Sequence, residues 1–87
     1  MLLLGLLMVA GCAPTCEQTC KKLADCDQVQ ASVEECTSAC NSQQNLYQDW
    51  EDQDKIDAFD ELKQCVSDHE CAVVADGECY NPEIYIW

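Results

Sequence analysis

Nine cysteines in a chain of 87 residues constrain the fold more than any other feature of this sequence. A chain of this length forms one domain at most, and it buries too little apolar surface for a comfortable margin of stability. Small exported domains commonly offset that deficit with disulfides, whereas the same cysteines in a reducing cytosol would indicate metal sites. The cysteine content therefore predicts an exported disulfide scaffold in an oxidising compartment.

The first cysteine, Cys12, stands apart from the other eight. It follows residues 2–10, which are apolar apart from one glycine. Such a run is too short to span a membrane, which takes about 20 residues, and it has the length of a signal-peptide core. The motif Val9-Ala10-Gly11-Cys12 resembles the lipobox of bacterial lipoproteins. That resemblance implies that the cysteine sulfur receives a diacylglyceryl group and that the chain is cut just before it.

Parity of the cysteines supports the same interpretation of Cys12. The remaining eight can pair into four disulfides and leave no exposed thiol. We therefore expect residues 1–11 to be a signal peptide and residues 12–15 a linker that carries lipid on Cys12. The alternative is an uncleaved N-terminal helix that packs in the core, with Cys12 in a disulfide. Because Ala13 follows, and not the Asp that holds some lipoproteins at the inner membrane, we expect the outer membrane.

Signals for helix starts divide the rest of the chain. A Ser or Thr followed three residues later by Glu or Gln forms a capping box. Such pairs occur at Thr15/Gln18, Ser32/Glu35 and Ser67/Glu70. With the apolar periodicity they predict helices at about 16–26, 33–43, 51–66 and 71–75, with 41–49 polar and prone to fray or loop. The sequence thus predicts an all-α domain over 16–81, a disulfide-stapled helical hairpin with a third helix and a short fourth in up-down-up order, and an apolar tail over 82–87.

Two Cys-x3-Cys motifs, at Cys16/Cys20 and Cys36/Cys40, define the hairpin. A spacing of four places both sulfurs on one face of a helix, one turn apart. Two such helices packed antiparallel can be joined by two parallel bridges, which pairs outer with outer and inner with inner: Cys16–Cys40 and Cys20–Cys36. This pattern resembles helical-hairpin scaffolds stapled by paired Cys-x3-Cys motifs. That resemblance implies an architecture but no particular activity.

The other four cysteines are Cys26, Cys65, Cys71 and Cys79. Because an up-down-up path brings the end of the third helix beside the end of the first, we expect Cys26 to bridge to the C-terminal group. Two pairings remain open, Cys26–Cys71 with Cys65–Cys79, or Cys26–Cys79 with Cys65–Cys71. The whole spacing resembles small cysteine-rich lipoproteins of delta-type, myxobacterial-class bacteria. That resemblance implies an anchored extracytoplasmic protein and no defined mechanism.

The charge balance narrows the function. Four Lys and Arg residues face 17 Asp and Glu residues, for a net charge of −13. Nucleic acids and anionic lipid headgroups both repel such a surface. A metal site is not expected, because Cys-x2-Cys is absent and His69 is the lone histidine. The acidic run 49–54 lacks the glycine and spaced glutamate of a calcium loop, and no catalytic motif or small-molecule site is evident.

We therefore expect a non-enzymatic structural or protein-binding module that needs no cofactor and is held at the membrane by lipid. Tyr and Trp are favoured anchors of protein interfaces, so Trp50, Tyr85 and Trp87 are candidate contacts with a protein partner. The alternative for these aromatics is that they cover a thin core. Two other functions stay open, a soluble secreted effector or inhibitor and a metal-binding thiol protein.

Overall fold

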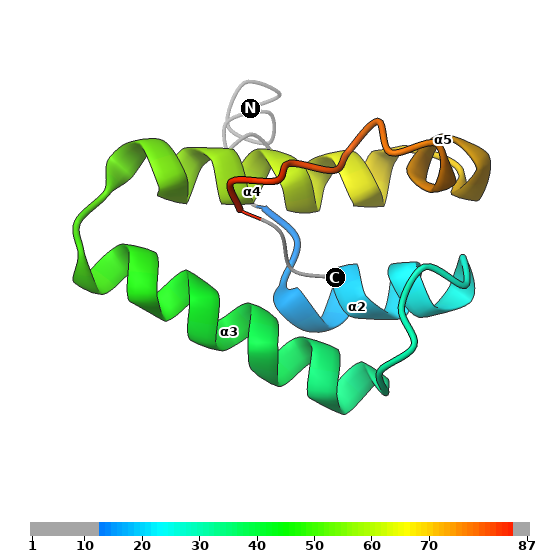
Figure 1. Cartoon of the computed structure of the whole chain (residues 1–87), viewed down its shortest axis with the longest axis horizontal. Coiled ribbons are helices and arrows are strands. Elements are labelled where there is room, and N and C mark those ends of the chain that lie inside the picture. Colours follow the sequence, from blue (N-terminus) through cyan, green and yellow to red (C-terminus); the bar gives the residue numbers. More distant parts are fainter. Residues whose placement is uncertain (1–12, 85–87) are drawn as a thin grey trace, which may run out of the picture.

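Helices alone make up the regular structure of the part of the chain that the computed structural model describes, residues 13–84. The order is α2 (Cys16–Asp25), α3 (Val33–Asp49), α4 (Gln53–Asp68) and the short α5 (Cys71–Ala75). The helices α2 and α3 form an antiparallel hairpin, and α4 packs against both (Figure 1). This arrangement confirms the predicted all-α, up-down-up fold of a hairpin with a third helix and a short fourth.

Reciprocal capping boxes start both helices of the hairpin, as the sequence predicts. The Thr15 hydroxyl accepts from the Gln18 amide at 3.1 Å, while the Gln18 side chain accepts from the Thr15 amide at 2.9 Å. Ser32 and Glu35 form the same pair, at 3.1 and 3.2 Å. Each box satisfies two backbone donors that a helix start would otherwise leave without an intrahelical partner.

The third predicted capping box, Ser67 with Glu70, is wrong. Ser67 lies inside the last turn of α4, and Glu70 precedes α5 without a side-chain cap. The C-terminal end of α4 is instead held by Lys22 from α2. The Lys22 ammonium donates to the carbonyl of His69 at 2.7 Å and to that of Ser67 at 3.4 Å. A cation beside the last carbonyls of a helix also favours its dipole.

The prediction that residues 41–49 fray or loop is also wrong, because α3 continues to Asp49. Its last turns carry one core residue, Tyr47, which is buried and packs edge-to-face with Phe59, with the ring centroids 5.8 Å apart. Asn and Gln residues surround Tyr47 in the sequence and hide the periodic signal. Tertiary packing of a single aromatic side chain therefore extends the helix beyond its local preference.

The core lies between α2, α3 and α4, where the hairpin cysteines are buried together with apolar side chains. The largest fully buried side chains include Phe59, Leu23, Val66, Val74 and Ile84. After α5 the chain returns along α4 (orange to red in Figure 1). Ile84 is 1% exposed, so the core extends into the segment that the sequence assigns to an apolar tail.

The Ser32 cap is expected to make a measurable contribution to stability. We expect Ser32→Ala to lower the free energy of unfolding by about 1 kcal/mol, because the Glu35 amide at the start of α3 loses its acceptor, the Ser32 hydroxyl. Guanidinium unfolding of the oxidised protein, followed by circular dichroism, measures this loss. Ser32→Asp restores an N-cap acceptor and is expected to recover most of it. An equal loss in both variants would contradict the assigned role of the cap.

Candidate functional site

Four disulfides hold the helices in place. Two of them join α2 to α3 as the spacing predicts, Cys16–Cys40 and Cys20–Cys36, with Cα–Cα distances of 5.7 and 5.8 Å. The C-terminal group adopts the first of the two pairings left open. Cys26–Cys71 ties the end of α2 to α5, and Cys65–Cys79 ties α4 to the returning segment. Together the four bridges use all eight cysteines from Cys16 onward.

Access to the sulfurs differs between the two pairs of bridges. All four cysteines of the hairpin are buried, with at most 4% of each residue exposed. In contrast, Cys71 is exposed and Cys65 is half-buried, although their partners are buried. A reductant must reach a sulfur to attack it, so the bridges of Cys71 and Cys65 are the accessible ones.

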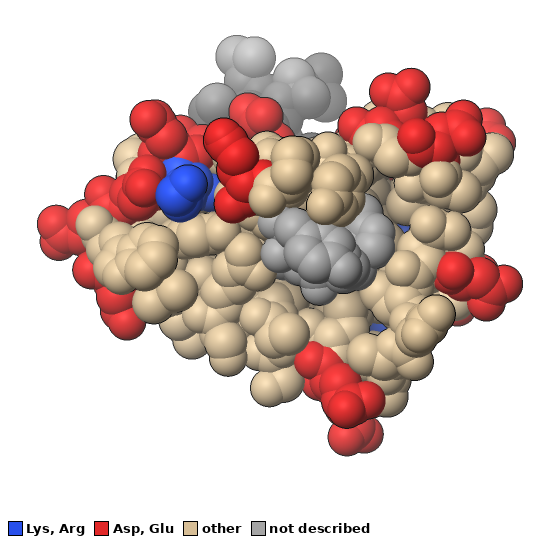
Figure 2. Space-filling model, in the orientation of Figure 1, with Lys and Arg blue, Asp and Glu red and all other residues tan. Residues whose placement is uncertain are grey.

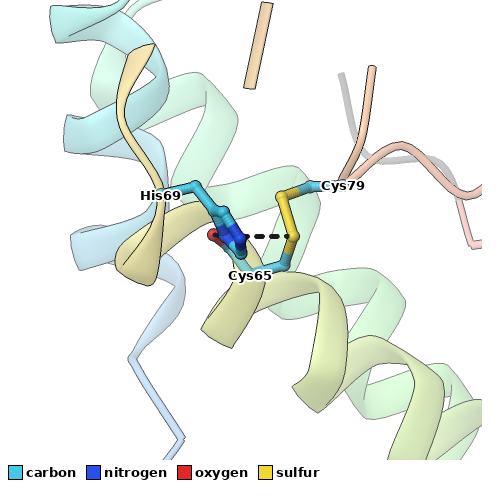
Figure 3. A group of neighbouring side chains, drawn as sticks. All are labelled: Cys65, His69 and Cys79. Carbon is cyan, nitrogen blue, oxygen red and sulfur yellow. Dashed lines mark hydrogen bonds between the residues drawn. A yellow bond between two sulfur atoms is a disulfide. The ribbon is translucent and has the colours of Figure 1, made fainter. Parts of the chain in front are cut away.

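One imidazole lies against an accessible disulfide (Figure 3). His69 follows the last turn of α4, and its Nδ1 lies 2.8 Å from the Cys65 carbonyl oxygen and 3.6 Å from Cys65 Sγ. The ligand atoms of Cys65, His69 and Cys79 all lie within 4.8 Å of one another. Both sulfurs are joined to each other, however, and a soft metal ion needs thiolates. In the oxidised protein this cluster therefore offers a metal only the imidazole.

The lysines are largely occupied within the protein. Lys63 is 4% exposed and donates to the Gln44 side chain at 2.6 Å. Lys22 caps α4, and Lys21 forms a surface ion pair with Glu17 at 3.8 Å. Figure 2 shows the result on one face, where carboxylates line much of the outline and lysine appears at few points. The described surface is therefore acidic with little compensating positive charge.

The end of α3 carries an exposed apolar surface. Trp50 is 58% exposed and Leu46, one turn earlier, is 43% exposed; we call these two residues the Trp50 patch. Tyr47 is buried beside them, and its ring centroid lies 6.1 Å from that of Trp50. The turn into α4 follows at once, with Glu51 at a positive φ of 55°. The Trp50 patch therefore lies at a helix end, beside the buried Tyr47 ring.

A groove forms beyond the same turn, where the returning segment meets the start of α4. It encloses about 260 Å³ and is lined by the charged residues Asp52, Asp54, Lys55 and Glu83, among others. Three carboxylates and one ammonium make the groove acidic. Sequence reasoning missed it because its walls, 52–58 and 81–84, are far apart in the chain.

The predicted site residues fall in different places. Trp50 is accessible, as a partner contact requires, and Leu46 joins it although the sequence interpretation did not single it out. The spacing of four between them is the available signal, but it places two residues side by side only in a helix, and the sequence predicts that 41–49 frays or loops. Tyr85, Trp87 and the lipidation candidate Cys12 lie outside the described residues.

Among the described helices, none combines the length and apolar character that a membrane crossing requires. Comparison of the chain with protein-family models, with curated proteins and with solved structures gave no match.

Proposed function

We propose that this chain is an exported lipoprotein, held at a bacterial membrane by lipid on Cys12, that acts as a non-enzymatic protein-binding module. Four disulfides indicate an oxidising, extracytoplasmic environment. One observation carries the anchor: the four bridges pair the other eight cysteines of this sequence with one another and leave Cys12 as the odd one. The lipobox-like motif that ends at Cys12 supports lipid attachment to this sulfur, because in bacterial lipoproteins the cysteine of the motif receives the diacylglyceryl group.

Charge explains why such a domain would need lipid. With a net charge of −13, the protein is repelled by anionic headgroups. Buried acyl chains supply about 0.8 kcal/mol for each CH₂ group, and two or more chains give stable anchoring. The residue after the proposed lipid site, Ala13, supports placement at the outer membrane under the sorting rule stated above.

The binding role is supported by the surface. Large side chains that stay exposed on a small acidic domain are suited to contact with another protein, and Trp is among the residues enriched at energetic centres of interfaces. The disulfides and the buried Tyr47 hold the Trp50 patch before any partner arrives. A preorganised surface loses less conformational entropy on binding.

The anchor is tested by intact-mass analysis of the protein extracted from host membranes. We expect loss of residues 1–11 and an added mass of diacylglyceryl on Cys12, and we expect Cys12→Ser to move the protein to the soluble fraction. The double variant Cys26→Ala/Cys71→Ala is the matched control, because it removes cysteines but keeps the anchor. Recovery of unlipidated protein from the culture supernatant would contradict the proposal and favour a secreted effector or inhibitor.

A further inference from the structure

The Trp50 patch lies in a strongly acidic stretch of the surface. Asp49 and Glu51 flank Trp50 in the chain and are exposed, and Asp54 is exposed on the first turn of α4. The carboxylates of these three residues form no hydrogen bond or ion pair within residues 13–84. The three carboxylates are therefore available to a positively charged ligand, and binding of such a ligand lowers the repulsion between them.

Few positively charged side chains of the protein are left to pair with these carboxylates. Lys21, Lys22 and Lys63 are engaged elsewhere, as described above. Lys55 is half-buried and lines the groove together with Asp52, Asp54 and Glu83. Even there carboxylates outnumber the ammonium by three to one, so the groove keeps a net negative charge.

We infer that the Trp50 patch and the adjoining acidic groove bind a cationic protein segment, one that presents Lys or Arg side chains around an apolar anchor. The inference rests on the proposed function and names the kind of partner that the module takes. The apolar anchor covers Leu46 and the Trp50 ring, while guanidinium or ammonium groups pair with Asp49, Glu51 and Asp54. The indole is also the aromatic face that attracts cations most strongly.

Two other occupants of this surface, a second copy of the chain and an anionic membrane, are disfavoured by their charge. A second copy of the chain would itself carry a net charge of −13, and like charges that meet at an interface oppose association. An anionic lipid surface is repelled for the same reason. A basic protein segment is instead attracted by the acidic surface, and steering by opposite charge also accelerates its association.

The binding test uses the oxidised chain from residue 12 onward with Cys12→Ser and Trp87→Phe, so that Trp50 is its sole tryptophan. The probe is a short amphipathic peptide of lysine and leucine, and the same peptide with glutamate in place of lysine is its counterpart. We expect the lysine peptide to shift the Trp50 emission to shorter wavelength and the glutamate peptide to leave it unchanged. Trp50→Ala, followed by calorimetry, is expected to weaken binding by at least about tenfold, as loss of an interface anchor does.

A matched pair of charge variants separates a site from bulk attraction. Asp49→Asn/Glu51→Gln/Asp54→Asn is expected to weaken binding about tenfold, because the carboxylates beside the patch pair directly with the peptide. The control Asp25→Asn/Glu34→Gln/Asp76→Asn removes the same charge elsewhere on the surface and is expected to change the affinity by less than about threefold. Equal weakening by both variants would overturn the inference. An unchanged Trp50 emission, or a shift with zwitterionic lipid vesicles in place of the peptide, would overturn it too.

A separate experiment distinguishes failure of this inference from failure of the proposed function. A photo-crosslinking amino acid at position 46, in the anchored protein in its host, identifies the segment that meets the patch. A crosslinked segment rich in Lys or Arg supports the inference, whereas a neutral or acidic one overturns it and leaves the binding module standing. Loss of the anchor in the mass analysis, with peptide binding intact, contradicts only the membrane tether.

Discussion

Reduction of all four disulfides is expected to unfold this domain in the absence of denaturant. The bridges join residues that are 24, 16, 45 and 14 positions apart. Loops of these lengths correspond to roughly 3–4 kcal/mol of stabilisation for each bridge, through the entropy of the unfolded chain. A whole domain is commonly stable by only about 5–15 kcal/mol. Loss of several bridges therefore exceeds the stability that so small a core supplies.

The bridges are expected to open in two stages. At limiting reductant, Cys26–Cys71 and Cys65–Cys79 open first, because Cys71 is exposed and Cys65 is half-buried while the hairpin sulfurs are shielded. Alkylation of samples taken along a dithiothreitol titration, with mapping by mass spectrometry, gives the order. Circular dichroism on the same samples is expected to retain most helix until the hairpin bridges open.

Cysteine variants test which of the bridges the fold depends on. Cys26→Ala/Cys71→Ala is expected to keep a cooperative thermal transition, since α2, α3 and α4 still pack together. Cys16→Ala/Cys40→Ala with Cys20→Ala/Cys36→Ala is expected to lose that transition. A fully reduced wild-type chain that still melts cooperatively would contradict the role assigned to the disulfides and would shift the main stabilisation to the apolar core.

The hairpin could be predicted from the sequence because its determinants are local. A spacing of four fixes which side of each helix the sulfurs occupy, and an antiparallel arrangement then fixes the partners Cys16–Cys40 and Cys20–Cys36. The capping boxes at Thr15 and Ser32 act within three residues, so they too are visible in the sequence. In these cases the physical interaction and the sequence pattern have the same short range.

Other features depend on contacts between distant segments, and the sequence pattern could not reveal them. The end of α4 is held by Lys22, more than forty positions earlier. Ser67 lies inside the last turn of α4 and therefore caps no helix. The end of α3 is helical because Tyr47 meets Phe59 across the core. The choice of Cys71 as the partner of Cys26 follows from where α5 docks. The accessible Trp50 could be proposed from its residue type, but the acidic groove required the fold.

Phe59→Ala is expected to cause the largest loss of stability among substitutions that leave the disulfides intact. Phe59 is 1% exposed, and its ring meets the Tyr47 ring and lies 5.3 Å from the Lys63 ammonium. Truncation of a buried aromatic costs about 3–5 kcal/mol, from lost burial and from the cavity that remains. The nearly buried Lys63 ammonium would also lose its contact with the ring face. The guanidinium unfolding midpoint of the oxidised protein measures the effect.

Phe59→Leu is the matched control because it keeps most of the volume, and it is expected to cost about 1.5 kcal/mol or less. The two variants also link the core to the surface. Since Phe59 supports Tyr47, and Tyr47 supports the Trp50 ring, Phe59→Ala is expected to broaden the range of Trp50 conformations even where the domain stays folded. Time-resolved fluorescence of Trp50 in the Trp87→Phe background measures this change. In that background, a Trp50 anisotropy that is equal with and without Phe59→Ala would show that the Trp50 patch is held by the helix end alone, independently of the core beneath it.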